Sequence, residues 1–345
     1  MERSRIILLC YRLSPRAFLP LSSMNLFSLF TASALWLCAC SSPGPASPDV
    51  PGSVTRIEWA VRPPGGDGAR SGTRAGDWYL IRRMDLFVFD DDGIGALDAY
   101  TRSFSYSPSA IEIRSAEGPK RVVAIANHPL PDGFVTSVGH YEDLKKIVAD
   151  LTEDDPSCPV MSGEARFTAG ADRSCSVTLE PVLSAVEIHS LTCKMEGAWA
   201  GMSLERVKVY LTGVSCRADL LRTEGFLPTE TLNNGGLSEH DMARLPYSGM
   251  VYRFLGNGRP SGGRTSYGTA SLYCYPDEAE EETPGSPFTR LVVEGTLDGT
   301  VCYYAFPINR SGGEEGIGRN RRYVFDLTLT RPGTESPDVD APITP

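Results

Sequence analysis

Short runs of alternating apolar and polar residues recur along most of this 345-residue chain, and 34 glycines and 26 prolines punctuate them. In the clearest run, Val54–Val61, the residues Thr55, Ile57, Trp59 and Val61 alternate with Arg56, Glu58 and Ala60. A period of two is typical of a strand with one buried face. The other strand candidates share this alternation or are rich in β-branched and aromatic residues: Met84–Phe89, Ile111–Ile113, Arg121–Ala126, Ser176–Leu179, Ala185–His189, Arg206–Leu211, Ser271–Tyr275, Arg290–Glu294, Cys302–Ile308 and Tyr323–Thr330.

One amphipathic helix is expected among these strands. In Tyr141–Leu151 the apolar residues recur at helical spacing. Because the strands otherwise follow one another without alternating helices, the pattern favours antiparallel sheets over βαβ units. We therefore expect an all-β fold made of two β-sandwiches. Their boundary is predicted near Pro181–Ser184, where one strand ends and a new apolar run begins.

The first forty residues predict export. Four arginines between residues 3 and 16 form a basic segment, and Leu26–Leu37 is apolar but too short to span a bilayer. The segment ends in Leu37-Cys-Ala-Cys40, which resembles the lipobox of bacterial lipoproteins. In that motif the cysteine thiol receives diacylglycerol, and the mature protein carries acyl chains such as palmitate. We predict a signal peptide at 1–39 and lipidation of Cys40. A start at Met24, and an ordinary signal with an incidental cysteine, are the alternatives.

The next segment predicts a tether. Residues 40–53 contain four prolines and few apolar side chains. Such a stretch cannot bury enough apolar surface to fold. It is expected to link the membrane anchor to the first folded domain.

The composition argues against a nucleic-acid partner and against catalysis. The formal net charge is −10, and no basic block offers phosphate contacts. The four histidines, His128, His140, His189 and His240, lack the spacing of a zinc site. No Gly-x-Ser-x-Gly elbow and no phosphate-binding glycine loop ahead of a helix occurs. We expect a protein that is not an enzyme and that uses no cofactor or metal.

Six cysteines remain beyond the tether: Cys158, Cys175, Cys193, Cys216, Cys274 and Cys302. The oxidising bacterial envelope permits disulfides. Cysteine also serves as a small buried hydrophobic residue. Disulfides and free thiols are both open on this pattern.

Several segments, taken in order, resemble the fimbrillin family of Bacteroidales type V pilus subunits. Behind Cys40 they are Thr73–Ala75, Met84–Gly93, Val122–Asn127, the amphipathic helix, Val160–Gly163, Leu183–Ile188 and Ile317–Gly333. The resemblance covers nearly the whole chain. It rests on the order and spacing of the set rather than on one motif.

The resemblance implies two transthyretin-like β-sandwich domains, at residues 54–182 and 183–332, and a proline-rich tail at 333–345. It also implies a lipid-anchored precursor in the outer membrane that an arginine-specific protease cuts after the first strand. Arg74 matches the cleaved position best and Arg70 second; an unprocessed loop arginine is the alternative. Loss of Val54–Val61 would open a groove for a strand from another fimbrillin subunit. The expected partners are therefore other subunits, the protease and the membrane.

The tail departs from the stalk subunits of that family. Residues 331–345 contain four prolines and no alternating apolar run. Because proline lacks the N–H that a sheet needs, this segment is a poor donor strand. We therefore expect a tip or accessory subunit of a cell-surface fimbrium with a role in adhesion. A fimbrial anchor subunit, and an outer-membrane lipoprotein that binds glycan, are the alternatives.

Overall fold

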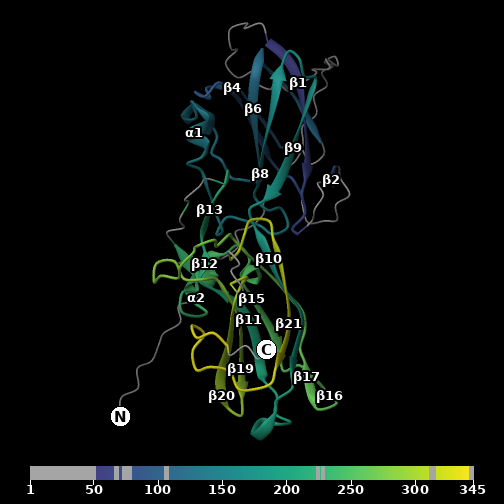
Figure 1. Ribbon diagram of the computed structural model, residues 1–345, viewed down its shortest axis with the longest axis vertical. Coiled ribbons are helices and arrows are strands. Elements are labelled where there is room, and N and C mark those ends of the chain that lie inside the picture. The colour runs from purple at the N-terminus through teal and green to yellow at the C-terminus, as the bar shows by residue number, and fades with distance from the viewer. Residues whose placement is uncertain are drawn as a thin grey trace, which may run out of the picture. The chain divides into compact units, whose positions relative to one another are not determined.

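Strands dominate the computed structural model, which describes residues 52–65, 70–71, 80–104, 109–222, 226, 230–310 and 316–341 (Figure 1). These described residues all belong to one compact unit. The prediction of a mainly β protein is confirmed, since several sheets account for most of the regular structure. No helix in the described ranges is long and apolar enough to cross a membrane.

The N-terminal sheet contains eight strands. They are β1 (Gly52–Val61), β2 (Arg70–Ser71), β3 (Met84–Asp90), β4 (Leu97–Ser103), β5 (Ala110–Ala116), β6 (Gly118–Ala126), β8 (Met161–Ala169) and β9 (Ser174–Pro181). Their order is β2-β1-β9-β8-β6-β3-β4, and β5 also pairs with β1. β8 and β9 are joined through only two residue pairs at one end.

That short β8–β9 junction lets two arms of the sheet face each other. The arm β5-β1-β9 and the arm β8-β6-β3-β4 send side chains into one hydrophobic core. Ile57 and Val177 come from the first arm, and Leu86, Val122 and Phe167 come from the second. Both arms therefore present one apolar face inward, as their alternation requires.

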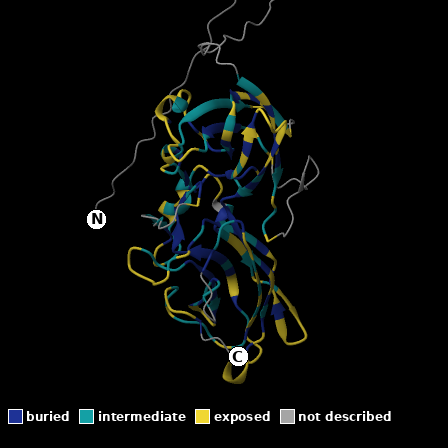
Figure 2. Cartoon of the chain, turned by 45° about the horizontal axis from the view of Figure 1, so that its top comes forward, coloured by how far each residue is buried: buried dark blue, intermediate teal, exposed yellow. Residues whose placement is uncertain are grey.

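The C-terminal part is built from two further sheets. One contains β10 (Ser184–Cys193), β16 (Arg259–Ser261), β17 (Arg264–Ser266), β18 (Ala270–Cys274) and β21 (Arg322–Leu329). The other has the order β15 (Tyr252–Gly256), β11 (Glu205–Thr212), β19 (Arg290–Leu297), β20 (Thr300–Pro307). Val186 and Leu272 from the first sheet and Val209 and Val293 from the second share one core. Figure 2 shows exposed residues concentrated in the connecting loops of this part.

Short elements complete the described fold. The helices are η1 (Phe134–Ser137), α1 (Tyr141–Leu144), η2 (Gly197–Trp199), α2 (Glu239–Arg244) and η3 (Ser248–Met250). Two small ladders pair β12 (Val214–Ser215) with β14 (Thr231–Leu232), and β7 (Val148–Asp150) with β13 (Arg217–Asp219).

The predicted helix Tyr141–Leu151 is wrong in its second half. Helix α1 ends at Leu144, and Val148–Asp150 forms β7. Leu144 and Leu151 are both fully buried, so two of the apolar positions of this run lie in the core. The backbone conformation instead follows the pairing of β7 with β13, about seventy residues later, and local spacing does not reveal such a partner.

The expectation of antiparallel sheets holds for most pairs but not for two. β1 runs parallel to β9, and β10 runs parallel to β21. The question of the cysteines is resolved in favour of thiols, because all six are buried and free. Burial raises the pKa of Cys158 to about 11 and that of Cys216 to about 12, so these thiols stay protonated at neutral pH.

Candidate functional site

The strand predicted to be removable, β1, is part of the N-terminal core. Thr55 and Ile57 are 0% exposed and Trp59 is 7% exposed, whereas Arg56 and Glu58 point outward and form an ion pair of 2.8 Å. Burial of the Ile57 and Trp59 side chains stabilises the strand by about 5 kcal/mol, at about 25 cal/mol per Å² of apolar surface. The alternation read from the sequence is confirmed.

Both edges of β1 are occupied. Residues 52–58 pair antiparallel with β5, and residues 56–61 pair parallel with β9. The last two residues of β1 also pair with β2. β1 is therefore an interior strand, and its departure would leave β5 and β9 with unpaired N–H and C=O groups on either side of an apolar slot.

Hydrogen bonds join the residues just after β1 to β9 and to the loop ahead of β21. The Arg62 N–H donates to the Leu179 carbonyl at 2.9 Å, and the Asn320 Nδ2 donates to the Arg62 carbonyl at 3.1 Å. The Gly65 N–H then donates to the Asn320 carbonyl at 3.2 Å. Asn320 adopts a φ of +55°, which asparagine tolerates better than most residues. The chain that follows β1 is thus held by the loop ahead of β21.

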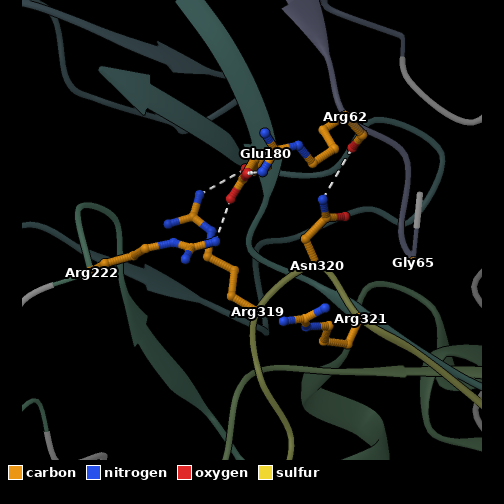
Figure 3. Close-up of a pocket in the computed structure, with 7 residues that line it drawn as sticks. All are labelled: Arg62, Gly65, Glu180, Arg222, Arg319, Asn320 and Arg321. Atoms are coloured by element: carbon orange, nitrogen blue, oxygen red, sulfur yellow. Dashed lines mark hydrogen bonds and ion pairs between the residues drawn. The ribbon is translucent and has the colours of Figure 1, made fainter. Parts of the chain in front are cut away.

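An arginine-lined cavity of about 340 Å³ lies at this same end of β1 (Figure 3). Its lining residues are Arg62, Gly65, Glu180, Arg222, Arg319, Asn320 and Arg321. The Glu180 carboxylate accepts hydrogen bonds from both Arg62 and Arg222. Four guanidinium groups therefore share a cavity with one carboxylate.

Arg319 is held by neutral oxygens rather than by a carboxylate. Its Nη1 donates to the Leu220 carbonyl at 2.7 Å, and its Nη2 donates to the Glu180 carbonyl at 2.7 Å and to Ser162 Oγ at 2.9 Å. Burial and the nearby Arg222 charge lower the pKa of Arg319 to about 10. The charge stays on at neutral pH and contributes a positive field to the cavity.

The residues predicted from the sequence as modification sites fall in different places. Cys40 and Arg74 lie outside the described residues. Arg70 lies in β2, where its backbone is the partner of Val61 at the end of β1. The arginine cavity was not found from the sequence, because its residues come from four separated segments and each looks like an ordinary surface residue.

A second cavity, of about 810 Å³, lies between β20 and β21. Among the described strands β21 pairs only with β10, so one edge of β21 faces this space. The predicted tail packs along the same region. Thr334 and Tyr303 exchange backbone hydrogen bonds of 2.8 and 2.9 Å, and the Ala341 N–H donates to the Ala305 carbonyl at 2.8 Å.

Among the described residues, no group of three or more histidine, cysteine, aspartate or glutamate side chains could hold a metal ion. Buried charges instead pair with one another. Asp85, fully buried in β3, bonds to the Nε atoms of Arg83 at 2.7 Å and Arg102 at 2.6 Å. Such a pair fixes the strand and its neighbours without offering a chemical group to a substrate.

Solved structures of bacterial surface proteins share this fold. A “putative cell adhesion protein” from Bacteroides eggerthii matches with a TM-score of 0.57 at 19% identity, over 86% of this chain and 95% of that chain. A fimbrilin from Porphyromonas gingivalis matches with a TM-score of 0.56 at 15% identity, over 84% and 95%. The tip fimbrial protein Mfa3 of the same species, with a C-terminal truncation, matches with a TM-score of 0.51 at 13% identity, over 79% and 94%.

The sequence itself gives no such match. No family model matches the chain, and no curated protein does. At these low identities the likeness shows a shared fold. The resemblance to fimbrillins read from the sequence is thus accompanied by structural similarity across most of the chain.

Proposed function

We propose that this protein is a non-enzymatic structural and adhesive subunit of a surface pilus that assembles by protease-triggered strand exchange. One observation carries the proposal. β1 fills an apolar slot between β5 and β9, and it is connected to the rest of the described sheet only through the segment that contains Arg70 and Arg74. A single cut in that segment would turn a covalently attached strand into an exchangeable one. The shared fold of fimbrilin and of a tip fimbrial protein supports the same assignment.

Within this proposal the chain divides near Pro181–Ser184 into two transthyretin-like domains, and β1 belongs to the first. Cys40 carries the lipid that holds the precursor at the outer membrane, and the processed subunit moves into the cell-surface fimbrium. The partners are other fimbrial subunits and an arginine-specific protease.

Arg74 is the preferred cleavage position and Arg70 the weaker one. Both residues of the bond that follows Arg70 are paired with β1. A protease binds its substrate as an extended segment with free backbone groups, so a bond inside a ladder is a poor target. The mature filament form is expected to begin at Ala75.

A tip or accessory role is proposed from the tail. Residues 331–341 contain Pro332 and Pro337, and their backbone bonds to β20 of their own chain at Thr334 and Ala341. A segment bound in this way is not available to a neighbouring subunit. Acceptance of a strand without donation places a subunit at a filament end.

A disulfide across β1 and β5 tests the exchange. The Trp59 N–H donates to the Ser109 carbonyl, so Trp59 and Ser109 are a hydrogen-bonded pair of this antiparallel ladder. Because such pairs alternate with pairs that are not hydrogen-bonded, Arg56 and Glu112, three positions along, are a pair of the second kind. The Cβ atoms of such a pair lie close enough together for a disulfide. The double substitution Arg56→Cys and Glu112→Cys, when oxidised, should allow cleavage but retain β1. We expect the locked subunit to be absent from sheared surface filaments, and reduction to restore it.

The matched control places cysteines at Arg259 and Ser266, an exposed antiparallel pair on β16 and β17. Oxidation there should leave incorporation unchanged. Equal incorporation of the β1-locked chain into filaments would contradict strand exchange and favour an anchor subunit or a lipoprotein that binds glycan.

A further inference from the structure

The cavity at the end of β1 has more positive charge than its own residues balance. Arg62 and Arg222 share the Glu180 carboxylate, and no described ion pair joins Arg319 or Arg321 to a carboxylate. Asp219 adds a favourable field at Arg319 but does not line the cavity. If Arg62 leaves with β1, three guanidinium groups and one carboxylate remain. The emptied cavity is still positive.

The resident strand is therefore an incomplete electrostatic match to its own slot: Arg62 pairs with Glu180, but it adds a fourth positive charge to the cavity. The guanidinium of Arg62 lies at Glu180 beside those of Arg222 and Arg319, and Arg321 lines another part of the same cavity (Figure 3). Like charges at this spacing repel, and partial burial weakens solvent screening. A strand with a carboxylate at the same position would give up the pair with Glu180 but would face three guanidinium groups, two of which have no described carboxylate partner.

Asn320 gives a second, independent indication. The residue is 5% exposed and lines the cavity, and its Oδ1 has no hydrogen-bond partner among the described residues, while its Nδ2 binds the Arg62 carbonyl. Two residues after that carbonyl the chain enters a turn at Pro64, which has no N–H to offer the Asn320 Oδ1. The resident segment thus leaves a buried acceptor unsatisfied.

We propose that this cavity recognises an acidic strand of another subunit, with a carboxylate at the position of Arg62 and a residue other than proline two positions later. The inference rests on the proposed function and specifies its partner. The carboxylate would accept hydrogen bonds from the guanidinium groups of Arg222, Arg319 and Arg321. The backbone N–H would reach the free Asn320 Oδ1. Both deficits of the resident strand would favour its replacement.

A peptide fits these features better than an acidic sugar does. Asn320 already binds a main-chain carbonyl, and its own carbonyl accepts the Gly65 N–H. The cavity therefore adjoins the edge of β9, where the Leu179 carbonyl accepts the Arg62 N–H. Recognition of backbone and side chain together is typical of strand addition to a sheet.

The test uses the full chain with a recognition sequence for a site-specific protease inserted between Thr73 and Arg74. After the cut, β1 stays bound until a competitor replaces it. The probes are fluorescent peptides of residues 52–65 that carry Arg62, Arg62→Gln or Arg62→Glu, each also with Pro64→Ala. Fluorescence anisotropy gives their dissociation constants.

We expect Arg62→Glu to bind about five-fold more tightly than Arg62→Gln at low salt, and native Arg62 to bind more weakly than both. The preference should shrink in 1 M salt. Pro64→Ala should tighten binding about three-fold in every background, because it satisfies one buried acceptor.

Substitutions in the receptor locate the effect. Arg321 is exposed and has no described side-chain partner, so Arg321→Gln should reduce the preference for glutamate without unfolding the protein. Arg264→Gln removes an equal charge from β17, outside the cavity, and should leave the preference unchanged. Equal or tighter binding of the native Arg62 peptide would overturn the inference while strand exchange stands. Stronger competition by N-acetylneuraminic acid than by the Arg62→Glu peptide would overturn the peptide assignment.

Failure of every peptide to bind would count against the proposed function. Thermal unfolding of the uncut chain then tests the inference about the cavity separately. Arg62→Glu should unfold at a higher temperature than Arg62→Gln if the cavity favours an anion. The reverse order would overturn it.

Discussion

β1 and β10 are the first strands of their respective sheets, and each lies parallel to a later strand, β9 or β21. Both carry fully buried isoleucines, Ile57 and Ile188. Their connections differ. β10 begins three residues after the end of β9, across the buried Val182 and Leu183, whereas β1 is followed by more than twenty residues before β3. In the proposed exchange, β1 therefore differs from β10 in its connection to the chain and not in weaker packing.

The largest expected effect tests this equality of packing. Ile57→Ala and Ile188→Ala each remove a fully buried side chain, so each should lower the free energy of unfolding by about 3 kcal/mol in urea. In a chain cut between β1 and β3, only Ile57→Ala should speed the loss of the β1 fragment. If Ile188→Ala speeded the loss of the β1 fragment equally, the contrast between β1 and β10 would be wrong.

The next effect depends on pH and acts on the part of the protein that would remain folded after β1 has left. Asp154 is buried, and it accepts hydrogen bonds from the Val160 N–H and the Tyr275 O–H, each at 3.0 Å. Burial raises the pKa of Asp154 to about 6, above the ordinary value of 3.8, although these hydrogen bonds oppose the shift. The proton is thus bound more tightly in the folded state. Its stabilisation is complete below pH 4 and is lost as the pH rises through 6.

We therefore expect this group to lower the free energy of unfolding by about 2 kcal/mol between pH 4 and pH 7. Asp154→Asn should remove that slope, as measured by urea titration at several pH values. Asp155→Asn is the control, because the pKa of Asp155 is lowered and its slope has the opposite sign. The rate at which a cut chain loses β1 should not follow Asp154.

A smaller effect distinguishes the loop that binds the end of β1 from a similar loop elsewhere in the C-terminal part. Asn320→Ala removes the hydrogen bond to the Arg62 carbonyl and strains a φ of +55°, at a cost of about 1.5 kcal/mol. Asn309→Ala makes a matched change, because Asn309 has a φ of +52° and donates to the Gly316 carbonyl at 2.8 Å. Both should lower stability, but only Asn320→Ala should hasten the release of β1. Hydrogen exchange of β1 amides in the cut chain measures the difference.

The smallest effect concerns the tail on β20. The Arg290 Nε donates to Asp340 Oδ1 at 2.7 Å, and Asp340 is half-exposed, so Asp340→Asn should cost only about 0.5 kcal/mol. Faster exchange of the Ala341 N–H, which donates to the Ala305 carbonyl, would report local loosening. Asp338→Asn, at an exposed position of the same segment, should leave that exchange rate unchanged.

The sequence predicts which segments form strands and which of their side chains face inward better than it predicts which strands pair with one another. The alternation in residues 54–61 identifies Ile57 and Trp59 as core, because side-chain direction is a local property. It contains nothing about β9 as a parallel neighbour, since pairing depends on the whole sheet. The same limit explains why Val148–Asp150 was assigned to a helix. The strand partner of that segment lies far along the chain.

The arginine cavity shows this limit for a site. The run Arg319–Arg322 lies within a segment that resembles the fimbrillin family, and nothing in the sequence assigns a role to Arg62 or Arg222. Their convergence on Glu180 follows from the junction of β1, β9 and the loop ahead of β21. Four consecutive polar residues at the start of a strand are a weak signal. They gain meaning once Asn320 is seen bound to the end of β1.

The slot that holds β1 has one parallel neighbour, β9, and one antiparallel neighbour, β5. An inserted strand that ran the opposite way would therefore still meet one neighbour of each kind. Backbone pairing alone therefore favours neither direction of insertion strongly. Polarity must be set by unlike features at the two ends of the slot, which are the arginine cavity at one end and the tight approach of Gly52 to the Ser115 carbonyl at the other. In a polymer built from such joints, these end features would determine which way the fibre points away from the cell.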